Sequence, residues 1–124
     1  LAQWLPTVLR RTHQSHLDAG RGLWQLASAF DDDLPAQFSA ANRRRRAMRR
    51  RVTQRLAERA WQAAGGAGDT PPLLVDAFAT VLSSFTTHSM LIDSRRSLDS
   101  LVRSSAAILC AVIDAQPGAP GSVR

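Results

Sequence analysis

The sequence predicts one all-α domain folded as a helical bundle. Apolar residues recur at steps of three and four through most of the 124-residue chain, and this is the period of an amphipathic helix. Proline and glycine clusters divide the pattern into about four helical segments, and no alternating apolar run indicates a strand. With 44% hydrophobic residues, the chain has enough apolar side chains to bury one core.

The first helical segment is expected over about residues 6–30, with an interruption inside it. Its apolar residues at helical spacing are Val8, Leu9, Leu17, Leu23, Leu26, Ala27 and Phe30. Gly20 and Gly22 interrupt this pattern, and each interior glycine costs about 1 kcal/mol relative to alanine. We therefore expect a corner or a loosened turn near Gly20, and Pro35 then ends or restarts the helix.

The second segment is expected as one long helix over about residues 35–64, with Asp33 as its N-cap. Its apolar stripe is Phe38, Ala41, Met48, Val52, Leu56 and Ala60. Nine of the sixteen arginines lie within residues 43–59 of this helix. The arginine stems fit a solvated helix face. The alternative is a phosphate-binding surface, because guanidinium groups pair with phosphate oxygens.

Two further helices are expected after the glycine-rich loop 65–68. Thr70 followed by Pro71 is a helix start signal, and the helix it opens should run to about Asp93. Ser97 should cap the last helix, which is expected over about residues 98–115. Residues 1–115 would then form the folded domain, and the proline- and glycine-rich residues 116–124 a flexible tail.

The helix expected to begin at Pro71 carries a polar band in an otherwise apolar element. Ser83, Ser84, Thr86, Thr87, His88 and Ser89 make up this band. Hydroxyl groups in an apolar setting suit a ligand pocket. The same hydroxyls could equally bond back to backbone carbonyls in ordinary packing.

The last helix is apolar nearly all round in its C-terminal half. Because a helix with no wet side must be covered on both sides, and four helices supply too few neighbours, we expect a second subunit to cover it. The expected dimer interface is formed by Leu82, Leu98, Leu101, Val102, Ser105, Ile108, Leu109 and Val112.

Catalytic, metal and cofactor motifs are not found in the sequence. His13 and His16 share a helix face without a matched acidic or cysteine ligand, and no phosphate loop or nucleophile elbow is present. We therefore expect no enzyme activity, no metal site and no cofactor. The single cysteine, Cys110, and the absence of a leader or a long apolar run indicate a cytoplasmic protein without a membrane partner.

The order of these features resembles the C-terminal regulatory domain of TetR-family repressors. The resemblance rests on the segment 17–30, the acidic residues 31–33, the arginine-rich helix to Ala64, the glycine loop, and the helices 73–93 and 98–113. It implies a homodimer in which the last two helices of each subunit form a four-helix interface. It also implies an inducer cavity, for which the candidates by helix face are Trp24, Phe30, Phe38, Met48, Val52, Phe78, Phe85 and His88.

The family further implies a separate N-terminal helix-turn-helix domain, which does not precede Leu1 in this sequence. We therefore expect a small-molecule-sensing, homodimerising regulatory domain of a TetR-like transcriptional repressor, which would contact DNA only through that missing domain. Its ligand would be small and apolar or amphipathic. The alternative is a stand-alone basic helical protein that binds nucleic acid or an acidic surface through the Arg43–Arg59 helix, since the net charge is +6.

Overall fold

The computed structural model describes residues 1–28 and 33–121, without the side chains of residue 21 and residues 23–28. These described residues are helical and contain no strand, so the all-α prediction is confirmed. In chain order the elements are α1 (Trp4–Ser28), α2 (Ala36–Ala63), α3 (Pro72–Val81), α4 (Ser84–Thr87), the π-helix η2 (His88–Asp93) and α5 (Leu98–Asp114).

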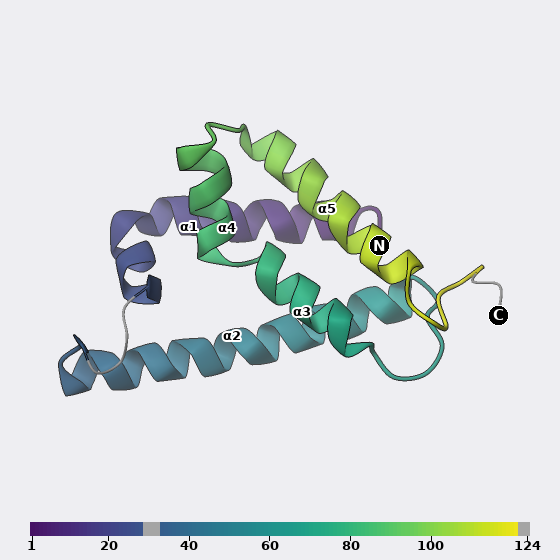
Figure 1. Ribbon diagram of the computed structural model, residues 1–124, viewed down its shortest axis with the longest axis horizontal. Coiled ribbons are helices and arrows are strands. Elements are labelled where there is room, and N and C mark those ends of the chain that lie inside the picture. Colours follow the sequence, from purple (N-terminus) through teal and green to yellow (C-terminus); the bar gives the residue numbers. More distant parts are fainter. Residues whose placement is uncertain (29–32, 122–124) are drawn as a thin grey trace.

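Helix α1 is two helical pieces joined by a sharp kink at Gly20. This residue has φ 69° and ψ −159°, a left-handed conformation that side chains with a Cβ rarely adopt. The corner predicted near Gly20 is therefore confirmed. It turns the second half of α1 down toward the N-terminal end of α2 (Figure 1).

Helix α2 follows the predicted length, but its predicted apolar stripe is buried only toward the C-terminal end, where Ala60 is buried and Leu56 packs against the core. Its buried residues are Ser39, Asn42, Thr53, Ala57, Ala60 and Trp61. The predicted stripe is instead exposed at Phe38, Met48 and Val52. Apart from Trp61, the side chains on the buried face are small or medium-sized polar groups and alanines, which let the neighbouring helices approach closely, whereas the predicted stripe followed the larger apolar residues. The prediction of Asp33 as the N-cap was also wrong, because Pro35 holds that position without a side-chain hydrogen bond.

The single helix predicted over residues 71–93 is broken after Leu82. Ser83 is extended, and its hydroxyl accepts a hydrogen bond from the Phe85 amide, which starts α4 as a new helix. Hydroxyl side chains offer the backbone such local alternatives to the regular helix. The predicted start was off by one residue, since Pro71 is the N-cap and no side chain caps α3.

The last helix, α5, begins as predicted. The Ser97 hydroxyl accepts a hydrogen bond from the Ser100 amide at 3.1 Å. After α5 the chain folds back over Trp61. Gln116 and Ala119 are buried there, and the Ala67 amide donates to the Gly118 carbonyl at 3.0 Å. The folded part of the chain therefore extends past residue 115, to Ala119.

Helix α3 is the central element of the arrangement. It packs against α2 on one side and α5 on the other, while α1 packs against α5 and α4. Only the C-terminal half of α2 lies beside α3; its N-terminal half runs out under the kinked end of α1 (Figure 1). The fully buried large side chains include Trp61, Phe78, Leu5, Leu9, Leu74, Leu101, Leu109 and Ile113.

Among the described helices, none combines the length and the apolar content that a membrane span requires.

Candidate functional site

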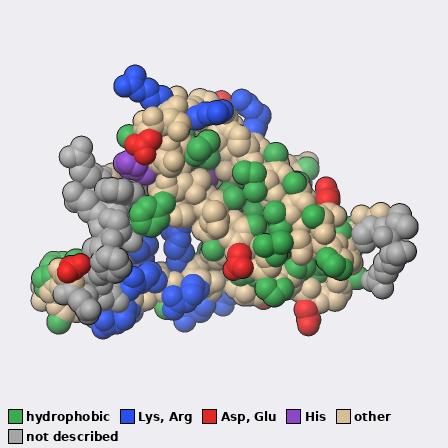
Figure 2. Space-filling model, viewed as in Figure 1, with side chains coloured by type: hydrophobic (Ala, Val, Ile, Leu, Met, Phe, Trp, Pro, Cys, Tyr) green, Lys and Arg blue, Asp and Glu red, His purple; other side chains and the backbone are tan. Residues whose placement is uncertain are grey.

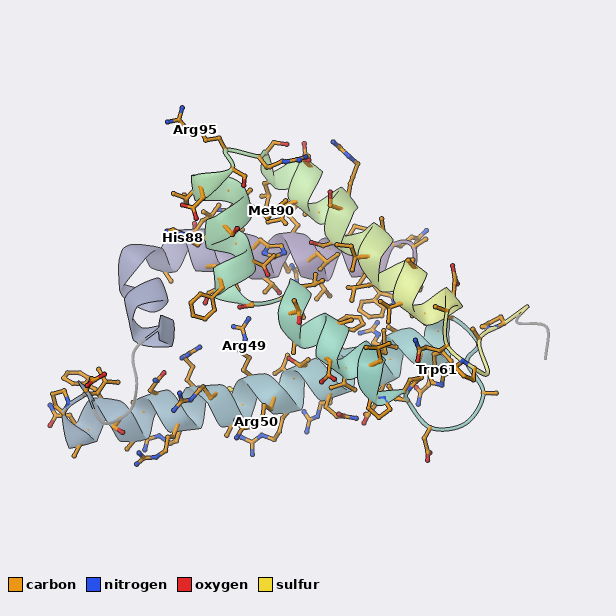
Figure 3. All side chains as sticks on the ribbon, viewed as in Figure 1. Arg49, Arg50, Trp61, His88, Met90 and Arg95 are labelled. Atoms are coloured by element: carbon orange, nitrogen blue, oxygen red, sulfur yellow. The ribbon has the colours of Figure 1, made fainter. Side chains whose placement is uncertain are left out.

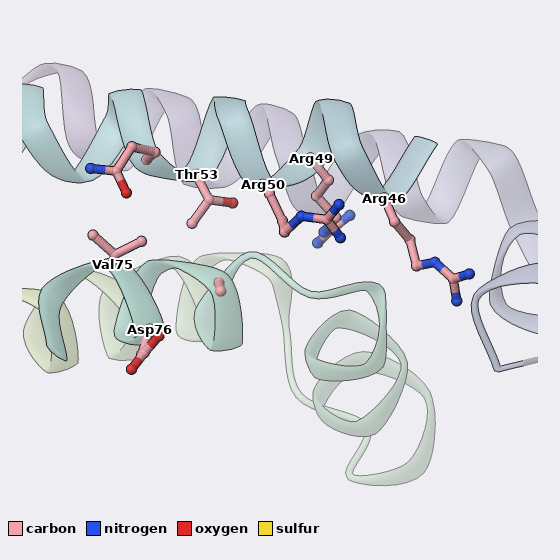
Figure 4. A pocket seen from close by; sticks show the side chains of 8 residues that line it. Arg46, Arg49, Arg50, Thr53, Val75 and Asp76 are labelled. Atoms are coloured by element: carbon pink, nitrogen blue, oxygen red, sulfur yellow. The ribbon is translucent and has the colours of Figure 1, made fainter. Parts of the chain in front are cut away.

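A pocket of about 440 Å³ lies between α2 and α3, and we call it the basic pocket. It is lined by Arg46, Arg49, Arg50, Thr53, Gln54, Val75, Asp76 and Ala79. Figure 4 shows Arg49 and Arg50 extending from α2 toward the space beside α3, with Val75 pointing back toward α2. The Asp76 carboxylate points away from α2 (Figure 4). The wall from α2 is therefore cationic, and the wall from α3 is mainly apolar.

Arg49 connects this pocket to the break between α3 and α4. Its guanidinium donates to the Leu82 carbonyl, which ends α3 where the regular helix stops. Figure 3 shows the Arg49 side chain extending from α2 toward the chain segment that joins α3 to α4. The other terminal nitrogen lies 3.4 Å from Nε2 of His16. Arg49 thus joins α2 to α1 and to the α3–α4 junction.

Two histidines of α1 meet Thr87 of α4 beside Arg49. Nδ1 of His13 and Nδ1 of His16 lie 2.8 Å and 2.7 Å from the Thr87 hydroxyl oxygen. Because Arg49 can only donate, Nε2 of His16 accepts, and His16 carries its proton on Nδ1. That proton is donated to Thr87. The hydroxyl proton of Thr87 has two acceptors within reach, Nδ1 of His13 at 2.8 Å and the Ser83 carbonyl at 3.4 Å.

The environment of these histidines disfavours their protonated forms. Burial, followed by the charge of Arg49, lowers the pKa of His13 from 6.5 to about 4. Burial and the same arginine also lower the pKa of His16 to about 4, with smaller contributions from His13 and Arg45. Both rings are therefore neutral at pH 7. Nε2 of His13 is buried and has no hydrogen-bond partner among the described residues.

Arg49 and Arg50 are not balanced by carboxylates among the described residues. The ion pairs between described residues are Arg10 with Asp99 and His88 with Asp93, so neither Arg49 nor Arg50 is paired with a described carboxylate. Burial, and secondarily the charge of Arg45, lowers the pKa of Arg49. A partly buried cation without a counter-ion is costly. The basic pocket is therefore a surface to which an anion would be attracted.

A second depression, which we call the apolar groove, lies on the other side of α3. It has a volume of about 340 Å³ and runs between α3, the α4–η2 segment and α5. Its lining is Leu73, Asp76, Ala77, Thr80, Val81, Thr86, Met90, Leu101, Ser104, Ser105 and Ile108. Leu73 and Ile108 are 58% and 52% exposed at its edges. Figure 2 shows hydrophobic side chains gathered on this face over α3 and α5.

The residues predicted to line an inducer cavity do not surround one enclosed space in the described part of the chain. Phe30 lies outside the described residues, as does the side chain of Trp24. Phe38, Met48, Val52 and Phe85 are exposed, Phe78 is fully buried in the core, and His88 is half-buried near Asp93. The six residues of this set whose side chains are described line neither the basic pocket nor the apolar groove.

The predicted interface residues divide between the subunit's own core and the groove. Leu82, Leu101, Val102, Ser105 and Leu109 are buried within the subunit, Leu98 and Val112 are half-buried, and Ile108 is exposed. Leu101, Ser105 and Ile108 line the apolar groove. The neighbouring exposed positions of α5 are Ala107 and Ala111. An outward-facing apolar strip therefore remains on α5, narrower than the all-round surface that the sequence indicated.

Sequence reasoning did not identify Arg49, His13, His16 and Thr87 as one cluster. The sequence suggested no role for the histidines beyond a metal site that lacked further ligands, and the structure buries His13 fully. Their spacing of three residues and their common partner on α4 could not be connected without knowing where the helix over residues 71–93 breaks. Trp61 is not part of the apolar stripe predicted for its helix, yet it is one of the largest buried side chains.

The cluster of His13, His16, Thr87 and Arg49 does not have the ligands of a metal site. Among the described residues, no three histidine, cysteine, aspartate or glutamate side chains gather in a way that could hold a metal ion. The sequence comparisons and the structural comparison give no further guide: no protein-family model, curated protein or solved structure matches this chain significantly. The function must therefore be argued from the basic pocket and the apolar groove.

Proposed function

We propose that this chain is a ligand-sensing, homodimerising regulatory domain of a TetR-like transcriptional repressor. One observation carries the proposal: α3 separates the basic pocket from the apolar groove and lines both. Val75 and Ala79 face the pocket, while Leu73, Ala77 and Thr80 face the groove. A molecule bound on one side of this ten-residue helix therefore acts directly on the surface at the other side.

The coupling follows from the contacts of α3 and Arg49. A ligand that favours one position of α3 over another shifts the populations of the two arrangements by its difference in affinity for them. Arg49 extends this effect, because it holds the carbonyl of Leu82 at the end of α3. In the TetR-like arrangement, such a change would alter the relative positions of two DNA-reading domains, which belong to the separate helix-turn-helix part of the protein.

A second copy of this chain suits the apolar groove better than a charged partner does. Among its described lining residues, Asp76 alone is charged, whereas nine of the sixteen arginines lie on α2. Two copies could therefore meet at α3 and α5 without bringing their arginine faces together. The exposed alanines of α5 also allow helices from two subunits to approach closely. A two-fold arrangement of these helices would form the four-helix interface that we expected.

The test of dimerisation uses Ile108, which is exposed at the groove. Ile108→Arg should convert a dimer to a monomer in sedimentation equilibrium, because it places an unpaired charge from each subunit in the interface. Val52→Arg is the matched control, since Val52 is a similarly exposed residue at 48% on α2. Leu109 is unsuitable for this test because it is fully buried within the subunit. A wild-type chain that is monomeric at all concentrations would refute the dimer.

The basic helix supports a second candidate function, binding of nucleic acid or another polyanion. Six of the α2 arginines are exposed, namely Arg43, Arg44, Arg50, Arg51, Arg55 and Arg59. Arginine contacts to phosphates position a protein without reading bases. DNA binding by this chain should therefore be weak, fall steeply between about 50 and 200 mM salt, and be insensitive to scrambling the sequence. Strong preference for one duplex over its scrambled form would show that the chain reads DNA itself.

A further inference from the structure

The basic pocket combines one charged and one apolar wall, and this combination restricts what can bind in it. Arg49 and Arg50 stand on the α2 side without a described carboxylate partner. Val75 and Ala79 form the α3 side. An uncharged apolar molecule would leave the guanidinium groups unpaired, and an inorganic anion would leave the apolar wall uncovered.

We propose that the ligand of this domain is a small amphipathic oxyanion, with its head on Arg49 and Arg50 and its apolar part against Val75 and Ala79. The inference rests on the proposed ligand-sensing function and names the chemical class of the ligand. Carboxylate and phosphate heads share the required chemistry, because guanidinium donors match the oxygens of both. The pocket volume of about 440 Å³ lies within the range of about 300–1,000 Å³ that small-molecule sites occupy.

Arg49 couples a bound anion to α3, because the same guanidinium lines the pocket and bonds the carbonyl at the end of α3. A guanidinium has five N–H donors, and the contacts to Leu82 and His16 use the two terminal nitrogens. An oxyanion can bind the three remaining donors, and it draws the guanidinium away from the neutral Leu82 carbonyl, because charge-assisted hydrogen bonds are the stronger ones. Binding therefore weakens the hold of α2 on the α3–α4 junction. A weaker contact between α2 and this junction lets α3 change its position, as the proposed regulation requires.

A nucleic acid fits this pocket less well than a small molecule does. None of its described lining residues is aromatic, so they offer no surface on which a base could stack. Thr53, at 4% exposure, closes the pocket next to Arg49 and Arg50. A phosphate backbone would instead be expected along the exposed arginines of α2, including Arg44 and Arg51.

The experiment compares four probes that share an eight-carbon chain: octanoate, octyl phosphate, octanol and octylammonium. Their affinities for the complete 124-residue chain are measured by calorimetry, with amide chemical shifts to locate the site. The two oxyanions should bind, octanol should bind at least about tenfold more weakly, and octylammonium should not bind. A comparison of the affinities for octanoate and octyl phosphate shows whether the pocket prefers a carboxylate or a phosphate head. Displacement of octanoate by a single-stranded oligonucleotide, at equal charge concentration, would overturn the small-molecule assignment.

The variants are chosen so that loss of folding cannot imitate loss of binding. Arg50→Gln should weaken octanoate binding about tenfold or more without unfolding the protein, because Arg50 is exposed and bonds to no described residue. Arg44→Gln removes the same charge from an exposed position outside the pocket and should leave the affinity unchanged. Equal losses in both variants would mean that only the overall charge attracts the anion, and the inference would be wrong.

The inference and the proposed function fail in different ways. A dimeric chain that binds octanol as tightly as octanoate keeps the ligand-sensing function and overturns the oxyanion class. A chain that is monomeric at every concentration, yet needs Arg50 to bind octanoate, loses the dimer and keeps the inference. Octanoate binding with no shifts of the amide signals of Val75 and Ala79 would place the ligand elsewhere and overturn the assignment of the site.

Discussion

Acidification should destabilise this protein in a pH range where carboxylates contribute little. His13 and His16 have pKa values of about 4 in the folded chain, against 6.5 as the ordinary value. The unfolded chain therefore takes up protons below pH 6.5 that the folded chain resists. The stability associated with the neutral rings is complete above pH 6.5 and is lost as the pH falls toward 4.

The size of the effect follows from this difference in pKa. One pH unit below 6.5, each histidine lowers the free energy of unfolding by about 1.4 kcal/mol. His13 is fully buried and should show this in full, while His16 is partly exposed and solvent reduces its share. Protonation would also turn Nε2 of His16 into a donor facing the donors of Arg49. The expected loss for the pair at pH 5.5 is therefore about 1.4–2.8 kcal/mol, a large part of a typical domain's stability.

The assay is urea unfolding followed by circular dichroism at pH about 7.5 and about 5.5. A variant with both His13→Gln and His16→Gln is the control and should lose most of the difference between the two conditions. The Asp99 carboxyl, whose pKa is lowered by its hydrogen bond from Arg10 and by that residue's charge, titrates below this range. Equal stability of the wild-type chain at both pH values, or an unchanged difference in the double variant, would refute the assignment of neutral, buried histidines.

Four substitutions test local packing and helix capping, each by the urea midpoint. Thr87→Val should cost about 1–3 kcal/mol, because it leaves Nδ1 of the buried His13 without its partner; no loss would contradict the hydrogen-bond chain. Gly66→Ala should cost about 1–3 kcal/mol, since the new Cβ would lie 2.2 Å from ring atoms of Trp61. In Gly22→Ala the new Cβ meets no described atom within 4 Å, so this variant should be neutral or stabilising by up to about 1 kcal/mol. A larger loss of stability in Gly22→Ala than in Gly66→Ala would contradict this geometry. Ser97→Ala should cost about 0.5–2 kcal/mol by removing the cap of α5, and an unchanged midpoint would show that the cap is replaced by water.

Local features of the chain could be predicted from sequence because their causes are local. The helical period, the kink at Gly20 and the Ser97 cap depend on residues within a few positions of each other. The existence and approximate limits of α2 and α5 followed from the same kind of signal. A backbone conformation that only glycine adopts readily, or a hydroxyl one turn before an apolar run, has much the same meaning in any surrounding fold.

The buried face of each helix was decided by the tertiary structure. In α2 the apolar pattern favoured Met48 and Val52, but the structure buries Thr53 and Trp61 and leaves the first two exposed. The helix period permits either rotation, and the choice depends on the shape of the neighbouring α3. In α5 the sequence is apolar nearly all round, and only the positions of α1 and α3 separate buried Leu109 from exposed Ile108.

The candidate site was also decided by the tertiary structure. His13, Arg49 and Thr87 lie on three different helices, and no spacing in the sequence relates them. The break after Leu82 frees the carbonyl that Arg49 binds. Neither that break nor the side of α2 that faces α3 follows from local propensity. Sequence alone therefore determined which segments are helices, while long-range packing determined which of their side chains meet, because contacts between distant residues depend on helix rotation and placement rather than on helix formation.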